Sequence, residues 1–137
     1  MKAILVILLC FLLFSCANTN LVYFANNYQE IARTDDAVPT LSSRVIKVRE
    51  FGECTNSSCP KEVLYITISE FGEYPEQRLY QTKKADEWQF IEWNHIPPLG
   101  EQNPTISFTM KSVNNNIETN YSVRVNLKTI EYKIINQ

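Results

Sequence analysis

Two cysteines in the middle of the chain have a spacing that suits disulfide chemistry. Cys54 and Cys59 are separated by Thr-Asn-Ser-Ser, a run of residues that favours a turn. Such a turn brings two Cα atoms within the distance that a disulfide requires. A redox-active pair more often has a Cys-x-x-Cys spacing beside a helix, and a zinc site needs four ligands, whereas this chain has one histidine. We therefore predict a structural disulfide that contributes about 2 kcal/mol.

The single histidine, His95, lies between Trp93-Asn94 and Ile96-Pro97. A histidine can serve as a general base or a metal ligand, but no serine or cysteine nucleophile motif accompanies this one. We expect a partly exposed loop residue, and we predict no catalytic residue, metal site or cofactor.

Two tryptophans, Trp88 and Trp93, are five positions apart on a predicted strand. Side chains alternate between the two faces of a strand, so this spacing predicts that they point to opposite sides. One would then lie in the core and the other would be exposed or near an edge, where it could act as an interface anchor. The alternative is that a second layer buries both. Trp88, Trp93 and His95 are our candidate interface residues.

Three acids, Glu70, Glu73 and Glu76, flank Gly72 and Pro75. Carboxylates are the ligands that calcium prefers, but this spacing matches no known calcium loop. We expect a solvated turn.

The N-terminus has the pattern of an export signal. The run from Ala3 to Phe14 is almost wholly apolar, follows Lys2, and ends in Leu13-Phe14-Ser15-Cys16. It is too short to span a bilayer. Residues 1–17 resemble the signal of bacterial lipoproteins, with a small residue before the cysteine and an aliphatic one three positions before it. Phe14 is bulkier than usual for that pattern.

The resemblance implies cleavage before Cys16, acylation of Cys16 and attachment to a membrane. Ala17 stands where many such proteins carry an aspartate for inner-membrane retention, which favours the outer membrane. The alternatives are a secreted protein cleaved after Ala17, or an uncleaved apolar helix. Cys10 leaves with the signal, so one even pair remains for an oxidising compartment.

Composition limits the class of protein. Residues 1–15 contain one basic residue and no acid, so their removal takes the formal net charge from −2 to −3. This mildly acidic net charge does not indicate the basic surface that a nucleic-acid-binding protein needs. Three glycines and many β-branched and aromatic residues favour strands and argue against disorder. The remaining length suits one domain.

The hydrophobic pattern divides the chain into a signal (1–15), a lipidated N-terminus and linker (16–43) and a β domain (44–137). From Arg44 onward apolar residues recur at every second position, with the clearest hairpin formed by 106–110 and 121–127 around a turn at 114–116. The alternation changes phase near Lys128-Thr129, which predicts a β-bulge there. Residues 45–53 resemble 65–73, and we interpret them as two neighbouring strands with similar exits.

These patterns predict an all-β domain, either an antiparallel β-sandwich (Ig-like) or a small β-barrel, of six to eight strands with one disulfide. We expect a non-catalytic cell-envelope module that binds a protein, peptide or glycan. The alternative is an envelope hydrolase that uses a carboxylate pair. An apolar cavity would indicate a small lipophilic ligand, whereas a cleft holding two carboxylates would favour the hydrolase.

Overall fold

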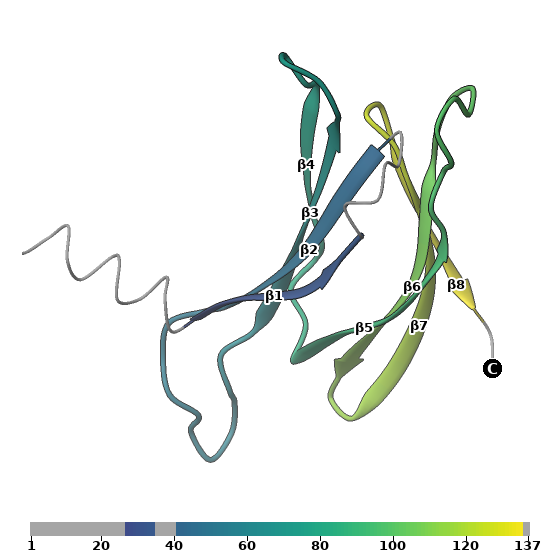
Figure 1. The fold of residues 1–137 in the computed structure, drawn as a ribbon. Coiled ribbons are helices and arrows are strands. Elements are labelled where there is room, and N and C mark those ends of the chain that lie inside the picture. Colours follow the sequence, from purple (N-terminus) through teal and green to yellow (C-terminus); the bar gives the residue numbers. More distant parts are fainter. Residues whose placement is uncertain (1–26, 35–40, 136–137) are drawn as a thin grey trace, which may run out of the picture.

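The computed structural model describes residues 27–34 and 41–135, and these residues form two antiparallel β-sheets (Figure 1). The strands are β1 (Tyr28–Arg33), β2 (Leu41–Arg49), β3 (Glu62–Glu70), β4 (Gln77–Gln81), β5 (Glu87–His95), β6 (Ile106–Asn114), β7 (Ile117–Val125) and β8 (Ile130–Ile135). Sheet A has the order β1-β2-β3-β4, and sheet B has the order β5-β6-β7-β8. The predicted all-β class is confirmed, and the architecture is a sandwich.

Each sheet is a simple meander, because every strand pairs with the strand that follows it within its sheet. This connectivity is simpler than the Greek key of immunoglobulin domains. Sheet A, in blue and teal, faces sheet B, in green and yellow (Figure 1).

Alternating side chains from both sheets form a single core. Its fully buried members include Val45, Leu64, Ile66 and Ile68 of sheet A, and Ile106, Phe108, Met110, Val123 and Val125 of sheet B. Burial of these apolar side chains between the sheets is the main favourable term in folding.

The predicted disulfide between Cys54 and Cys59 is present, with Cα atoms 4.0 Å apart. It lies in the β2–β3 loop, whose residues from Phe51 to Cys59 are all exposed. The disulfide therefore closes a small solvent-facing loop and contributes nothing to the core.

The hairpin expected around 114–116 is confirmed. β6 and β7 pair from Ile106↔Val125 to Asn114↔Ile117, and the two turn residues Asn115 and Asn116 have φ of 51° and 62°. Asparagine tolerates this left-handed conformation, and a two-residue hairpin turn requires it. The two similar segments are indeed neighbouring strands, since β2 and β3 pair along their whole length.

Two local expectations are wrong. The apolar phase change near Lys128-Thr129 is a turn between β7 and β8, closed by a bond from Asn126 N–H to Thr129 O, and not a bulge within one strand. The β structure also begins at Tyr28, before the expected start of the domain at Arg44, because β1 and the first residues of β2 precede it. β1 lacks a clean alternation because its register shifts between Glu30 and Ala32.

Cys16 and the whole signal-like segment lie outside the described residues, as does most of the expected linker. Among the residues that are described, no helix has the length and apolarity needed to cross a membrane.

Candidate functional site

A cleft of about 510 Å³ opens between the sheets where the chain crosses from β4 to β5. Its floor belongs to the inner face of sheet B, and its rim is the crossing segment, residues 81–84. Its lining includes Lys83, Lys84, Trp88, Ser112, Tyr121, Tyr132 and Ile134. The volume lies within the range of about 300–1,000 Å³ that is typical of small-molecule sites.

The cleft lies beyond the end of β4, which reaches only the turn before β8. β4 reaches the β7–β8 turn, where the Tyr80 hydroxyl donates to Asn126 O (2.9 Å) and Arg78 Nε donates to Leu127 O (3.1 Å). Sheet A ends at Gln81, so it leaves the C-terminal part of β8 uncovered. Tyr132 pairs with Val123, which is buried, so Tyr132 and Ile134 both lie on the inner face of β8. They are nevertheless 41% and 58% exposed.

Aromatic rings and hydroxyl groups form the floor. The rings of Trp88 and Tyr121 lie 5.7 Å apart at a tilt of 43°. The Ser112 hydroxyl donates to the Tyr121 hydroxyl over 3.5 Å, and Ser112 is only 1% exposed. The floor therefore combines apolar ring surface with the Tyr121 hydroxyl, a polar group that could fix a ligand's orientation.

The position of Trp88 is held from three directions. Its indole N–H donates to Lys83 O (3.0 Å), and its backbone N–H donates to Glu62 Oε2 (2.8 Å). Its strand partner in β6 is Ser112. Trp88 is 4% exposed, so these contacts fix the position of its side chain in the floor.

The rim of the cleft is basic. Lys84 forms an ion pair with Glu50, which raises the pKa of the lysine and holds the pKa of the Glu50 carboxyl below its usual range. Lys83 is exposed, and no carboxylate within the described part of the chain lies at ion-pair distance from it. Burial raises the pKa of Tyr132, so its phenol stays neutral and can donate a hydrogen bond.

The expectation that Trp88 and Trp93 face opposite sides is wrong. The register of β5 shifts between Phe90 and Glu92, so one extra residue restores Trp93 to the core face. The Trp93 ring lies 4.8 Å from that of Phe90 and 5.3 Å from that of Phe108. Trp88 is buried and Trp93 is partly buried against the core, so the alternative that a second layer covers both tryptophans holds fully for Trp88 and in part for Trp93.

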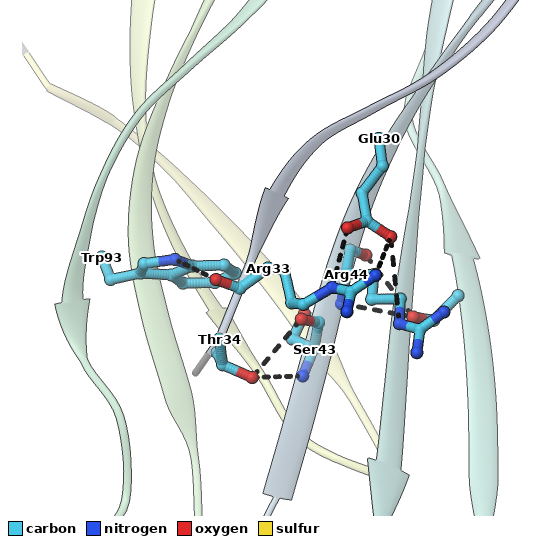
Figure 2. A network of polar contacts seen from close by, with 7 residues as sticks. Glu30, Arg33, Thr34, Ser43, Arg44 and Trp93 are labelled. Carbon is cyan, nitrogen blue, oxygen red and sulfur yellow. Dashed lines mark hydrogen bonds and ion pairs between the residues drawn. The ribbon is translucent and has the colours of Figure 1, made fainter. Parts of the chain in front are cut away.

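Trp93 also connects the two sheets. Its indole N–H donates to Arg33 O of β1 over 3.2 Å, as Figure 2 shows. His95, the third candidate interface residue, is exposed at the end of β5, where its Nε2 lies 3.2 Å from Glu101 Oε2. Of the three candidates, only Trp88 lines the cleft.

A second cavity, of about 540 Å³, lies on the outer face of sheet A and is lined by polar residues such as Ser42, Arg44 and Thr67. The network in Figure 2 borders it: the Glu30 carboxylate accepts from Arg33 Nε (2.8 Å) and lies 3.9 Å from Arg44 Nε. The hydrogen bond from Arg33 is the main cause that lowers the pKa of Glu30. Both arginines thus share one acid, so the Glu30 carboxylate offsets only part of their charge.

A third cavity, of about 200 Å³, is lined by two acids, Glu70 and Glu76. It is small for a glycoside substrate, and Arg78 Nη2 lies 3.2 Å from the Glu76 carboxylate. Glu76 is therefore committed to an ion pair. No group of three metal-ligating side chains occurs among the residues that the structure describes.

Sequence patterns alone did not identify the cleft. Tyr132 and Ile134 alternate with polar residues, as does Tyr121, but nothing in this spacing shows that the opposing strand stops short of them. No protein-family model, curated protein sequence or solved structure matches this chain.

Proposed function

We propose that this protein is a lipid-anchored cell-envelope module that binds a small apolar ligand bearing an anionic group, without catalysing a reaction. The observation that carries the proposal is the cleft between the sheets, with its aromatic floor and basic rim. The cleft favours a small lipophilic ligand for this binding module, and not a protein, peptide or glycan partner.

The chemistry of the lining favours an amphiphile. Trp88, Tyr121, Tyr132 and Ile134 offer apolar surface for a chain or ring. Lys83 is available for an anionic head at the mouth of the cleft, and a charge-assisted hydrogen bond to it would orient the ligand. A fatty carboxylate or an aromatic sulfonate has both features.

The anchor rests on the resemblance of residues 1–17 to lipoprotein signals. Acylation of Cys16 would hold the domain at a membrane surface, on the outer membrane by the argument from Ala17. Amphiphiles concentrate at such surfaces, so an anchored domain with this cleft would work close to its ligand. Secretion after cleavage at Ala17 is the alternative, and it leaves the cleft unchanged.

Fluorescence titration tests the binding proposal. We expect 1-anilinonaphthalene-8-sulfonate to bind the purified full chain with saturable, blue-shifted emission, and sodium laurate to displace it. Ile134→Lys should weaken binding at least tenfold, because it places a charge on the apolar floor. Lys83→Glu should weaken it by about threefold to tenfold, because it replaces the attractive charge with a repulsive one.

Ile117→Lys is the matched control, because Ile117 is 68% exposed and does not line the cleft. It should leave binding of both compounds unchanged. Equal affinity in wild type, Ile134→Lys and Lys83→Glu would refute the cleft as the binding site.

A further inference from the structure

We propose that β8 is a self-association edge: it pairs antiparallel with β8 of a second copy of this chain, about a two-fold axis at Tyr132, and joins the two B sheets into one. This inference does not require a ligand in the cleft, although Tyr132 and Ile134 belong to both surfaces. It rests on the exposure of β8, on the direction of its backbone groups, and on the order of its charges.

β8 is an exposed sheet edge. Of the strands in the described part of the chain, only β7 pairs with it. Every residue from Glu131 to Ile135 is exposed, including Tyr132, Ile134 and Ile135, at 41%, 58% and 40%. An edge strand with exposed apolar side chains is a template for pairing with another strand.

The backbone of β8 determines which residues can bond across that edge. Asn126 N–H donates to Thr129 O, and Val125↔Ile130 is the next pair of the ladder. Because bonded and non-bonded pairs alternate in an antiparallel ladder, Ile130, Tyr132 and Ile134 point their N–H and C=O groups away from β7. These three residues must face one another in any β8–β8 pair.

This condition places the two-fold axis through a residue, and the registers that pair most of the strand have it at Glu131, Tyr132 or Lys133. An axis at Glu131 sets two glutamates opposite each other, and an axis at Lys133 sets two lysines opposite each other. An axis at Tyr132 places Glu131 of each copy opposite Lys133 of the other. Opposite charges across strands stabilise and like charges destabilise, so the register at Tyr132 is selected.

The same register also pairs the apolar residues. Ile130 of one copy lies opposite Ile134 of the other, and the two Tyr132 residues lie side by side on the inner face. The floors of the two clefts, which contain Tyr132 and Ile134, thereby become continuous. Side-by-side contact between these side chains buries part of the apolar edge of each copy.

Of the other edge strands, β4 and β5 lack this self-complementarity, and in β1 the two opposite charges, Glu30 and Arg33, are already paired with each other across a register shift. β4 carries one charge, Arg78, so no register pairs it with an opposite charge of its own copy. The charges of β5 are acidic, at Glu87 and Glu92, and two register shifts interrupt its edge. Among the edge strands of the two sheets, only β8 has a glutamate and a lysine placed symmetrically about a central residue.

A charge-swap series tests the proposal, with the full chain expressed and purified as the cell processes it. Sedimentation equilibrium should show a monomer–dimer equilibrium for the wild type. Lys133→Glu and Glu131→Lys should each raise the dissociation constant about tenfold or more, because each opposes like charges twice. The double variant Glu131→Lys/Lys133→Glu should restore the wild-type value, since it reverses every pair.

Cysteine cross-linking tests the register. Tyr132→Cys should form a disulfide-linked dimer of twice the chain mass under oxidising conditions, because residue 132 faces itself at a distance that a disulfide can span. Glu131→Cys and Lys133→Cys should each stay monomeric alone and form a mixed dimer when co-expressed. Cys54 and Cys59 are already paired, so the wild type is the background control.

Several results would overturn the proposal. The proposal is wrong if the wild type stays monomeric at the highest protein concentration reached. It is also wrong if the double variant Glu131→Lys/Lys133→Glu fails to restore association. A Tyr132→Cys adduct of a mass other than twice the chain would show that a strand of another protein takes this edge. Loss of amphiphile binding with intact dimerisation would refute the proposed function alone.

Discussion

The backbone N–H of Trp88 on β5 donates to the Glu62 carboxylate on β3 across 2.8 Å, between the two sheets. Glu62 is 7% exposed, and Lys47 Nζ lies 3.6 Å from its Oε2. Glu62 and Ala85 also form an isolated antiparallel bridge. This one glutamate therefore fixes where β5 starts, and with it the floor of the cleft.

Glu62→Ala should lower the free energy of unfolding by about 1–3 kcal/mol, because it leaves the Trp88 amide buried and without an acceptor. Glu62→Gln keeps an acceptor oxygen and should cost less. Urea unfolding monitored by tryptophan fluorescence measures both. Glu118→Ala is the control: Glu118 is exposed in a surface ion pair with Lys111, so its loss should cost under about 1 kcal/mol. Equal losses for Glu62→Ala and Glu118→Ala would contradict this account.

The Cys54–Cys59 disulfide closes an exposed loop, so its contribution should be small and separable from the core. The double variant Cys54→Ser/Cys59→Ser should lose about 2 kcal/mol of stability and keep the fold, as judged from its circular dichroism spectrum. Denatured but unreduced wild type should show no reaction of Cys54 or Cys59 with a thiol reagent. Labelling of either residue would show that the bond does not form in the cell.

Stability should fall on the acid side of neutrality, partly through Asp86. Hydrogen bonds from Lys61 and, over 2.6 Å, from Asn115 N–H lower the pKa of Asp86 below its ordinary value of 3.8. A carboxyl group with a depressed folded-state pKa stabilises the fold above its unfolded-state pKa. That stability is lost as the pH falls through the folded-state value.

Asp86→Asn should therefore be less stable than the wild type at pH 7, and the difference should shrink as the pH falls below about 4. Urea midpoints at pH 7, 4 and 3 measure this. A difference that stays constant across the three pH values would show that Asp86 does not act through its ionisation.

The proposed lipid anchor has a direct chemical signature. Mass spectrometry of the protein isolated from its native envelope should show Cys16 as the acylated N-terminal residue, and Cys16→Ser should abolish the modification and release the protein from membranes. An unmodified N-terminus at Asn18 would favour secretion instead.

Most of the sandwich could be predicted from the sequence because its strands bury one face and expose the other. β6 and β7 alternate without interruption from Ile106 to Val125, and there the prediction was accurate. It failed where the backbone departs from the period of two. No residue type near Ile91 marks the extra residue that shifts the register of β5. Because of this shift, Trp93 lies on the opposite face of the strand from the one that simple alternation predicts.

The cleft could not be predicted for a different reason. Tyr132 and Ile134 have the same pattern as covered core residues, and their exposure depends on β4 ending at Gln81 in the other sheet. The two segments are about fifty residues apart in the sequence, and neither contains a pattern that indicates where the other ends. Lys83 likewise gains its position at the rim from the crossing segment, not from a motif.

The location of a bound amphiphile tests the central claim most directly. In a titration of isotope-labelled protein with sodium laurate, followed by amide NMR spectra, we expect the largest shifts at Lys83, Trp88, Ser112 and Tyr132, which line the cleft. Shifts centred on Arg44, Thr67 and Leu79 would place the ligand on the outer face of sheet A and contradict the account. The absence of any saturable shift would contradict it equally.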